Sequence, residues 1–455
     1  MTPQELKNSI LQLAIQGRLV EQLDSDTPVD LSAYKLNKTD DPEFEIPDKW
    51  QIAHLESVTD AIPSKQYQIL ESQVLKEGLY PVISQSKEYS IGYSNETTKL
   101  FHHNESVIVF GDHTTEIKLV DFDFVVGADG VKIFAPKKCL TPSFFFYVMQ
   151  YLCIDLSKVG GYSRHYKYIK NKPILLPPLA EQKRIVVQIE KLLPLINRYE
   201  KAWSKLEDFN KRFPGDMQKS VLQMAIQGKL VEQRPEEGTG EELYRQIQAE
   251  KQSLIKSGKI KKEKPLPEIS EDEIPFDIPE SWKWTYINEI AFVTKLAGFE
   301  YTKYMAGAIL SRGYVPIVRA KNIKPNRFIE NQEEFITLDL SKQLQRCALD
   351  SECVLMTFIG AGIGEVAVFD NKRRNHLAPN VAKIVPHMKM SKYLMYYFMS
   401  PTGQTEIFQF MKAVAQPSLS METIRKVKVP LPPLAEQKHI VQKLEQILPL
   451  CEKLK

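Results

Sequence analysis

Two long segments occur twice in this chain, and their order is the strongest constraint on how it can fold. Residues 176–195 return at 431–450 with fourteen of twenty positions identical, at an offset of 255. Residues 9–21 return at 220–232 with ten of thirteen positions identical, at an offset of 211. We call these the AEQ segments and the AIQG segments, after letters that they contain. The chain is therefore an internal duplication.

The duplication is circular. Along the chain the order is AIQG, a variable region, AEQ, AIQG, a second variable region and AEQ. The AEQ segment thus runs into an AIQG segment in the middle of the chain, while the terminal copies are separated by the whole protein. We expect the terminal copies to pack together, so that each half holds one AIQG segment, one AEQ segment and one variable region in pseudo-two-fold symmetry.

Each AEQ segment predicts a helix. Pro177 and Pro178 stand where the first helix begins, a position that tolerates proline. Apolar residues then recur at steps of four and three from Ile185 to Leu206, which is typical of a coiled coil. Pro194, and Pro449 in the second copy, predict a kinked helix, with two abutting helices as the alternative.

The AIQG segments predict shorter helices that end at glycine. One spans about Asp216 to Gln227 before Gly228, and the other ends before Gly17. Residues 241–256 predict a further helix, which has no counterpart after the first AIQG segment. Together with the AEQ helices, these segments predict two long-helix regions that form an antiparallel coiled coil.

The two variable regions share landmarks although their sequences differ. A polar linker leads to Ile-Pro-x-x-Trp at residues 46–50, and a second leads to the same motif at 278–282. Each region later has an aromatic helix, opened by Thr141-Pro142 in the first and by Ser391 in the second. Short strands are predicted at 107–110, 131–134, 354–358 and 366–369. The fold class is therefore α/β (α+β), with two globular domains built on curved, mostly antiparallel sheets.

Composition narrows the class of protein. The apolar fraction of 43% supports packed cores, and a net charge of +3 is too small to identify a nucleic-acid binder by itself. Residues 1–21 form an amphipathic pattern rather than a signal peptide, and no segment predicts a membrane span. We therefore expect a cytoplasmic protein. Its cysteines read as reduced core residues: Cys139, Cys153, Cys347, Cys353 and Cys451.

No catalytic or cofactor motif stands out. The glycines of residues 360–364 follow GxGxG rather than GxGxxG and precede a strand-like VAVF, which favours a glycine turn over a nucleotide site. The tetrapeptide of amino-methyltransferases, Asn or Asp followed by Pro-Pro and an aromatic residue, is absent. His102, His103 and His113 lack the companion ligands of a metal site. We predict no catalytic, cofactor-binding or metal-binding residues in this chain.

The repeated motifs resemble a known family. PLPPLAEQK, AIQGKLVEQ and the linker KEKPLPEISEDEIPFDIPESW are similar to those of the specificity subunit of Type I restriction-modification systems, and the likeness covers essentially the whole chain. The resemblance implies a subunit without catalytic chemistry, whose two target recognition domains each read half of a bipartite, asymmetric site in double-stranded DNA. It also implies that the conserved helices dock two modification (methyltransferase) subunits, that restriction subunits join afterwards, and that S-adenosylmethionine, ATP and Mg belong to those partners.

This resemblance predicts five parts. They are an N-terminal helix that packs with the C-terminal helix (1–23), the first target recognition domain (24–175), a central helical spacer (176–264), the second target recognition domain (265–430) and a C-terminal helix (431–455). A helix from Leu179 to Arg212 would be about 50 Å long. One turn of B-DNA is about 34 Å, so we hypothesise that the helices act as a ruler between the half-sites.

DNA contacts are predicted in loops where amide, hydroxyl and cationic side chains cluster beside glycine or aromatic residues. Amides and arginine pair with base edges, while lysine and hydroxyl groups mostly position phosphates. In the first domain the candidates are Ser84, Gln85, Lys87, His113, Thr114, Tyr162, Ser163, Arg164, His165 and Lys167. In the second they are Arg319, Lys321, Asn322, Thr357, Arg373, Arg374, Lys412, Gln416 and Ser418. For each of them, a solvated loop side chain is the alternative.

Two other functions are alternatives to a DNA-reading subunit. A coiled-coil adaptor that assembles methyltransferase subunits without reading DNA is one, and the unlike loops of the two domains disfavour it. A self-sufficient restriction or modification enzyme is another, disfavoured by the missing motifs. The lysine run in residues 256–264 is ambiguous, and a solvated linker is favoured over a phosphate contact.

Overall fold

The computed structural model describes residues 1–34, 45–127, 130–158, 164–262, 264–360, 362–409 and 418–454. They form two compact units, Met1–Asp208 and Phe209–Lys455. Each unit contains one AIQG segment, one variable region and one AEQ segment, as the duplication predicts. The packing of the two terminal helices against each other stays a prediction.

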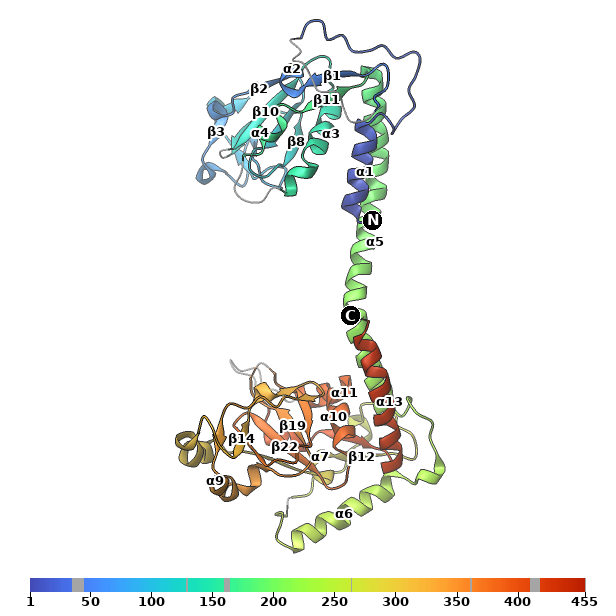
Figure 1. Cartoon of the computed structure of the whole chain (residues 1–455), viewed down its shortest axis with the longest axis vertical. Helices are drawn as coiled ribbons and strands as arrows, with labels where there is room; N and C mark the ends of the chain where they lie inside the picture. The colour runs from blue at the N-terminus through green and yellow to red at the C-terminus, as the bar shows by residue number, and fades with distance from the viewer. Residues whose placement is uncertain are drawn as a thin grey trace. The chain divides into compact units, whose positions relative to one another are not determined.

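In the first unit, helix α1 (Pro3–Ile15) lies antiparallel to the first part of helix α5 (Leu179–Ile226), as Figure 1 shows. The hydroxyl of Tyr199 on α5 donates to the carbonyl of Met1 over 2.7 Å, which fixes the direction of the pair. One apolar cluster joins the two helices and includes Leu11, Ala14, Ile15, Ile185, Val186 and Ile189.

Helix α5 differs from the sequence-based expectation. Pro194 predicts either a kink or two abutting helices, and a separate helix is expected to begin near Asp216. Instead, α5 continues without interruption through both positions and through Pro214. An interior proline costs about 3 kcal/mol, whereas each fully buried aliphatic side chain contributes roughly 1.5–3 kcal/mol. Burial of apolar residues near both ends of α5 therefore offsets the cost of the prolines.

In the second unit, the last part of α5 packs against helix α13 (Leu434–Glu452). Helix α6 (Gly240–Lys256) follows, one residue longer than predicted, and begins at a capping box between Thr239 and Glu242. The α5–α13 contact contains Val221, Leu222, Ala225, Ile226, Ile440, Leu444 and Leu448. Lys256 at the end of α6 and Lys259, Lys261, Lys262 and Lys264 after it are exposed, which is compatible with a solvated linker and with a phosphate contact alike.

One polar contact is repeated in both units where the variable domain joins its helices. The indole Nε1 of Trp50 donates to Glu181 Oε2 over 3.0 Å, and that of Trp282 donates to Glu436 Oε2 over 2.9 Å. Both carboxyl groups are buried, and burial raises the pKa of each. The two Ile-Pro-x-x-Trp motifs therefore have the same task, which is to seat a domain on its AEQ helix.

The predicted glycine stops are confirmed at the same junction. Gly17 and Gly228 both have φ of 71°, in the left-handed region that favours glycine. A Cβ atom at Gly17 would lie 2.5 Å from Pro47 Cγ, and one at Gly228 would lie 2.4 Å from Pro279 Cγ. The AIQG helix thus ends where the Ile-Pro-x-x-Trp motif packs against it.

Replacing Trp50 by phenylalanine should lower the free energy of unfolding by about 1–3 kcal/mol, because the buried Glu181 carboxyl loses a donor. Trp282→Phe should cause a similar loss through Glu436. Urea denaturation measures both effects. Trp203→Phe on α5 is the control and should change stability little; a loss at Trp203 equal to that at Trp50 would contradict the importance of the junction.

The first variable domain contains two sheets and a ribbon. One sheet has the order β2-β10-β7-β8, another has β3-β9-β4-β5 with β6 also beside β9, and β1 pairs with β11. The elements are β1 (Gln51–His54), α2 (Leu55–Val58), β2 (Thr59–Ile62), β3 (Gln68–Ile69), β4 (Tyr80–Ile83), β5 (Tyr93–Ser94), β6 (Leu100–Phe101), β7 (Val107–Gly111), β8 (Ile117–Val120), β9 (Phe124–Gly127), β10 (Val131–Pro136), α3 (Pro142–Leu152), α4 (Tyr166–Ile169) and β11 (Pro173–Leu176).

The second variable domain repeats the first sheet as β13-β22-β19-β20 and the ribbon as β12-β23, and adds β17-β14-β21-β18 and β15-β16. Its elements are β12 (Lys283–Tyr286), α7 (Ile287–Ile290), β13 (Ala291–Lys295), α8 (Gly298–Glu300), β14 (Val315–Val318), β15 (Ile323–Lys324), β16 (Arg327–Phe328), β17 (Phe335–Ile336), α9 (Leu338–Gln343), β18 (Ala348–Leu349), β19 (Cys353–Thr357), β20 (Val366–Phe369), β21 (Asn375–Leu377), β22 (Val381–Pro386), α10 (Ser391–Met399), α11 (Pro401–Phe408), α12 (Met421–Arg425) and β23 (Lys428–Leu431).

The predicted α/β (α+β) class with mostly antiparallel sheets is confirmed. Parallel pairing is confined, among the described strands, to β3 with β9, β4 with β9 and β14 with β21. The four-stranded sheet shared by both domains is antiparallel throughout. The ribbons also match, since Gln51 pairs with Leu176 and Lys283 with Leu431.

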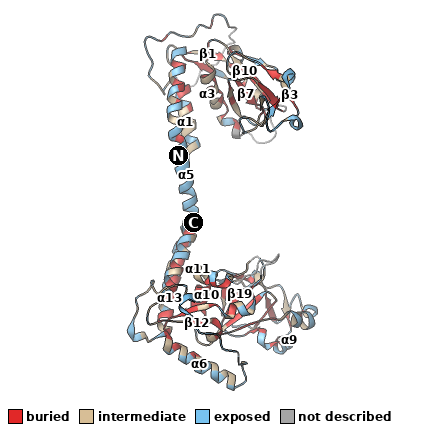
Figure 2. Ribbon diagram, turned by 180° about the vertical axis from the view of Figure 1, so that it is seen from behind, coloured by how far each residue is buried: buried red, intermediate tan, exposed pale blue. Residues whose placement is uncertain are grey.

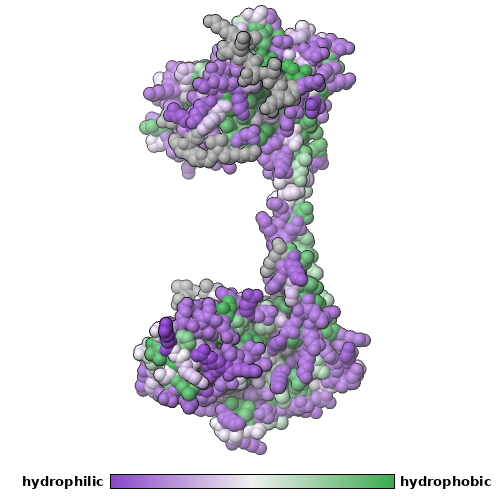
Figure 3. Space-filling view, in the orientation of Figure 1, coloured by the Kyte–Doolittle hydropathy of each residue, from purple (hydrophilic) through white to green (hydrophobic). Residues whose placement is uncertain are grey.

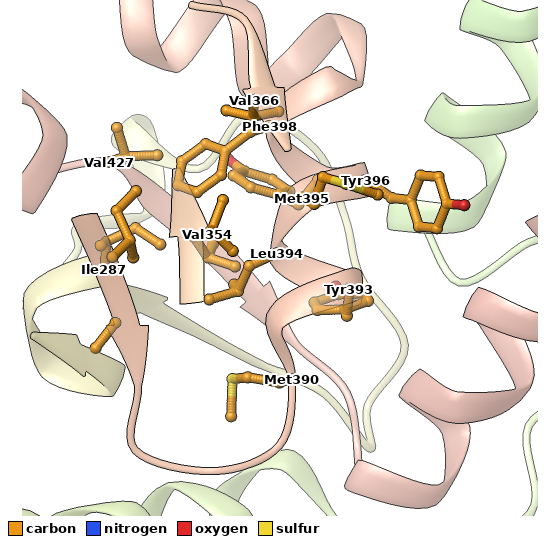
Figure 4. Packing of buried hydrophobic residues seen from close by; sticks show 14 of the residues in the cluster. Ile287, Val354, Val366, Met390, Tyr393, Leu394, Met395, Tyr396, Phe398 and Val427 are labelled. Atoms are coloured by element: carbon orange, nitrogen blue, oxygen red, sulfur yellow. The ribbon is translucent and has the colours of Figure 1, made fainter. Parts of the chain in front are cut away.

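The aromatic helices α3 and α10 cover the shared sheet in each domain. Buried residues, red in Figure 2, gather between helix and sheet. Figure 4 shows this packing in the second unit, where Leu394 and Phe398 of α10 lie near Val354 and Val366 of the sheet. Ser391 is the first residue of α10 rather than its cap, a position held by Met390. The five cysteines are free and buried, as predicted.

Candidate nucleic-acid interface

In the first unit, the turn between β7 and β8 meets a second predicted DNA-contact loop. The Thr114 hydroxyl donates to the Gln85 carbonyl over 2.6 Å, and the backbone N–H of His113 donates to Gln85 Oε1 over 3.3 Å. The close approach needs glycine, because a Cβ at Gly111 would lie 2.8 Å from Gln85 Cβ. Two clusters that are far apart in sequence therefore form one surface.

A third predicted cluster joins the same turn through Asp112. The backbone N–H of His165 donates to the Asp112 carbonyl over 2.7 Å, and the N–H of Tyr166 donates to Asp112 Oδ1 over 2.7 Å. Asp112 itself donates its N–H to the carbonyl of Gly130 over 2.7 Å. We call the surface formed by residues 84–88, 112–116 and 164–167 the first rim.

Lys118 holds the other side of the first rim. It lies on β8 and is only 5% exposed, and its Nζ donates to the Ser84 carbonyl over 2.8 Å and to the carbonyl of Glu88. Burial lowers the pKa of this ammonium group. Lys132 lies 4.0 Å from Asp112 Oδ2 and 4.8 Å from the centre of the Tyr166 ring, which adds positive charge to the rim.

The candidates of the first domain differ in exposure. Ser84 and His165 are each 5% exposed, and His165 Nδ1 lies 3.0 Å from the Asp112 carbonyl, so both side chains face protein. Tyr162 and Ser163 lie outside the described residues. Exposed candidates are Lys87, Thr114, Arg164 and Lys167. Contact of these side chains with DNA stays a prediction.

The second unit builds the same position from other residues. The backbone N–H of Phe358 donates to the Asn380 carbonyl over 2.9 Å, and the N–H of Leu419 donates to the Phe358 carbonyl over 3.0 Å. These bonds correspond to those of Asp112 with Gly130 and His165. Asn380 has φ of 78°, close to the 80° of Gly130. The backbone of the rim is therefore repeated, while its side chains are not.

The glycine-containing residues between β19 and β20 form turns, as predicted. The N–H of Ile363 donates to the Gly360 carbonyl over 3.2 Å, and the N–H of Gly364 donates to the Thr357 carbonyl over 2.9 Å. Ser418 is exposed and bridges Ile359. Lys412 and Gln416 lie outside the described residues. Thr357 is fully buried, and its hydroxyl lacks a hydrogen-bond partner within the described part of the chain.

Most of the remaining candidates in the second domain are engaged by protein groups. Arg319 pairs with Glu334, and Lys321 pairs with Glu333 over 2.6 Å. Asn322 is fully buried.

The same holds for Arg373 and Arg374. Arg373 donates to the Tyr314 carbonyl over 2.7 Å, and Arg374 donates to Ser341 Oγ over 2.9 Å. These bonds hold loops of the domain together, so a role in DNA binding would require the side chains to change partners.

Sequence reasoning missed several residues of the two surfaces. Asp112 directly follows the apolar strand β7, and Lys118 lies within the strand β8. A charged residue at either position is a usable signal. Lys324 lies 3.8 Å from Glu365, and the N–H of Asn326 donates to the Val366 carbonyl over 3.1 Å, beside the β19–β20 turn. The basic residue Lys324 directly before Pro325-Asn326 is the sequence signal that indicates the turn between β15 and β16.

The described residues contain no cluster of three or more His, Cys, Asp or Glu side chains arranged to hold a metal ion. Within the same residues, no helix combines the length and the apolar character needed to cross a membrane.

Comparisons with known proteins give a consistent result. A family described as "Type I restriction modification DNA specificity domain" matches residues 47–203 and 279–454. The Escherichia coli Type I restriction enzyme EcoAI specificity subunit is 24% identical, over 99% of this chain and 90% of that protein. The EcoEI specificity subunit of the same species is 22% identical, over 99% and 90%. A crystal structure of the HsdS subunit from Thermoanaerobacter tengcongensis is 16% identical, covering 90% of this chain and 92% of that chain, with a TM-score of 0.46.

Proposed function

Because this chain belongs to the Type I restriction modification DNA specificity family, we propose that it is the DNA-recognition subunit of a Type I restriction-modification complex. Each variable domain, 24–175 and 265–430, reads one half of a bipartite, asymmetric site in double-stranded DNA. The subunit is not catalytic and works in the cytoplasm. Methylation and cleavage belong to partner subunits, which carry S-adenosylmethionine, ATP and Mg.

One observation carries the proposal: the two units share a scaffold but differ at the rim. Sheet order, ribbon and Trp–Glu junction are repeated. The rim position occupied by Asp112 and His165 in one unit is occupied by Phe358 and Leu419 in the other. Sequence-specific binding depends on the side chains presented to base edges, so a common scaffold with different rims suits two different half-sites.

The helices supply the remaining functions. On α5, Phe209, Phe213 and Met217 recur every four residues and are 54%, 38% and 39% exposed. Figure 3 shows apolar side chains, in green, on this stretch of α5. Exposed apolar stripes mark protein-binding faces. We assign this face to the docking of two modification subunits, which restriction subunits then join, and we assign to the helices the spacing between half-sites.

Replacing Arg164 and Lys167 together by alanine should weaken DNA binding about ten- to hundred-fold and flatten its salt dependence, because the rim loses two exposed cations. The target site is first found by sequencing methylated bases in the source genome. Affinity is then measured by titrating DNA with the chain bound to its modification subunits.

Lys138→Ala is the matched control. Lys138 is exposed. The carbonyl of its neighbour Cys139 accepts a hydrogen bond from Gln182 of α5, so Lys138 lies on the side of the domain that faces α5 and away from the rim. Its replacement should leave affinity unchanged. If the unaltered complex bound the target site and unrelated DNA equally well, the chain would be an adaptor that does not read DNA. If the chain alone methylated or cleaved DNA, it would be an enzyme.

A further inference from the structure

Two charged side chains that support the first rim are buried. Asp112 and Lys118 are each 5% exposed, and they stand at opposite ends of the β7–β8 turn. A buried charge is strongly unfavourable unless hydrogen bonds compensate it, so each needs partners that the fold keeps in place. Lys118 donates to the carbonyls of Ser84 and Glu88, and Asp112 accepts from the N–H of Tyr166, so these hydrogen bonds reach loops of the rim. Asp112 is also paired with Lys132 of β10 over 4.0 Å.

Asp112 fixes the loop that follows the aromatic helix. Its Oδ1 accepts from Tyr166 N–H and its carbonyl accepts from His165 N–H, both over 2.7 Å. Arg164 and Lys167, on either side of these two residues, are exposed. The carboxylate therefore sets the height and direction at which two cationic side chains leave the surface.

Lys118 fixes the other loop. Its ammonium group bonds to the carbonyls of Ser84 and Glu88, which bracket Gln85 and the exposed Lys87. A lysine that joins both ends of a five-residue loop limits the conformations of every residue between them. The amide of Gln85, which accepts from His113 N–H, is thereby held at the rim.

The second unit shows that the hairpin itself does not need these charges. Lys118 pairs across the hairpin with Val109, and the matching pair on β19 and β20 is Leu355 with Ala367. Phe358 takes the place of Asp112 and keeps the same backbone bonds. The second unit thus builds the same hairpin with Phe358 in place of Asp112 and Ala367 in place of Lys118. The charges of Asp112 and Lys118 therefore serve the loops of the first rim.

We propose that Asp112 and Lys118 are positioning residues that determine base preference at the half-site read by the first unit, without touching DNA. This inference rests on the proposed function and adds residues to it. Removing either charge loosens one rim loop, so that correct and incorrect bases bind more equally. The half-site read by the second unit is unaffected.

Lys118→Met and Asp112→Ala test the proposal in the full chain bound to its modification subunits. Lys118→Met keeps the length of the side chain and removes both hydrogen bonds to the loop carbonyls of Ser84 and Glu88, so urea denaturation first establishes that the variant is folded. Affinity is measured for the intact site and for sites altered in one half or the other. Discrimination at the first unit's half-site should fall about 10- to 100-fold, which is the effect of about one base pair.

Asp112→Asn is the conservative variant. Its amide oxygen still accepts from Tyr166 N–H, so it should recover most of the discrimination lost in Asp112→Ala. Unchanged discrimination in Lys118→Met and Asp112→Ala, or equal losses at both half-sites, would overturn the inference and leave the proposed function standing. Absence of discrimination at both half-sites in the unaltered protein would overturn the proposed function, and this inference with it.

Discussion

Exchanging residues 55–172 for the same region of another family member should change one half of the recognised DNA site and leave the other half as it was. Each mismatched base pair costs about 1–3 kcal/mol, roughly additively. A half-site of several base pairs should therefore lose on the order of a thousand-fold in affinity or more when its reader is replaced. Methylome sequencing of cells that express the hybrid reads both halves at once.

The boundaries of this exchange follow from the structure. Residues 55–172 lie between β1 and β11, so the ribbon and the Trp50–Glu181 contact stay native and continue to seat the domain. The reciprocal control exchanges residues 287–427, between β12 and β23, and should change the opposite half-site. Hybrids that alter both halves, or neither, would show that the two domains do not read DNA independently.

Replacing Gly403 by alanine should lower the free energy of unfolding of the second unit by about 4 kcal/mol or more, a range reached when a side chain has no room. Gly403 lies in α11, directly after the turn from α10. A Cβ atom there would lie 2.0 Å from the Tyr397 carbonyl oxygen and 2.9 Å from Phe398 Cα. Both are backbone atoms of α10, so relief requires the two helices to separate. Urea denaturation and the yield of folded protein measure the effect.

Gly215→Ala is the matched control for the same substitution. A Cβ at Gly215 would meet no atom within 4 Å, and the residue lies inside α5, where alanine is favoured over glycine by about 1 kcal/mol. This variant should be slightly more stable than the native chain. A Gly403→Ala protein as stable as Gly215→Ala would mean that α10 and α11 do not pack as closely as described.

The repeated parts of the fold were predictable because identical residues make identical local contacts. The AIQG and AEQ helices, the glycine stops and the Ile-Pro-x-x-Trp motifs all appear in the structure, and the strands predicted at 107–110 and 366–369 are present. The contact that each Ile-Pro-x-x-Trp motif makes with its AEQ helix was not predictable from the sequence. The partners Trp50 and Glu181 are 131 residues apart, and only tertiary structure brings them together.

Helix α5 shows where local rules were insufficient. Proline is a dependable breaker when a helix has only its own hydrogen bonds to stabilise it. In this chain, α1 packs on the first part of α5 and α13 packs on the last part, and that burial outweighs the local cost. Such packing involves residues that are distant in sequence, so the helix boundaries near Pro194 and Asp216 could not be found from sequence windows.

The candidate site was predictable as clusters rather than as residues. Residues 84–87, 113–115 and 164–167 do meet in the first unit, because loops at one edge of a sheet converge. Composition could not distinguish Arg164, which is exposed, from Arg374, which bonds to Ser341 and Asp350. Which arginine is already satisfied depends on acceptors elsewhere in the domain, and only the folded structure places them.

The ribbons β1–β11 and β12–β23 have a consequence for how such proteins change over generations. Because the chain enters and leaves each domain through adjacent antiparallel strands, the intervening stretch can grow, shrink or be traded without moving the helices outside it. The second stretch is already the longer one, yet its Trp–Glu contact matches that of the first. Recombination with one exchange point in each strand of a ribbon would replace a whole variable domain at once and leave the helices outside it unchanged.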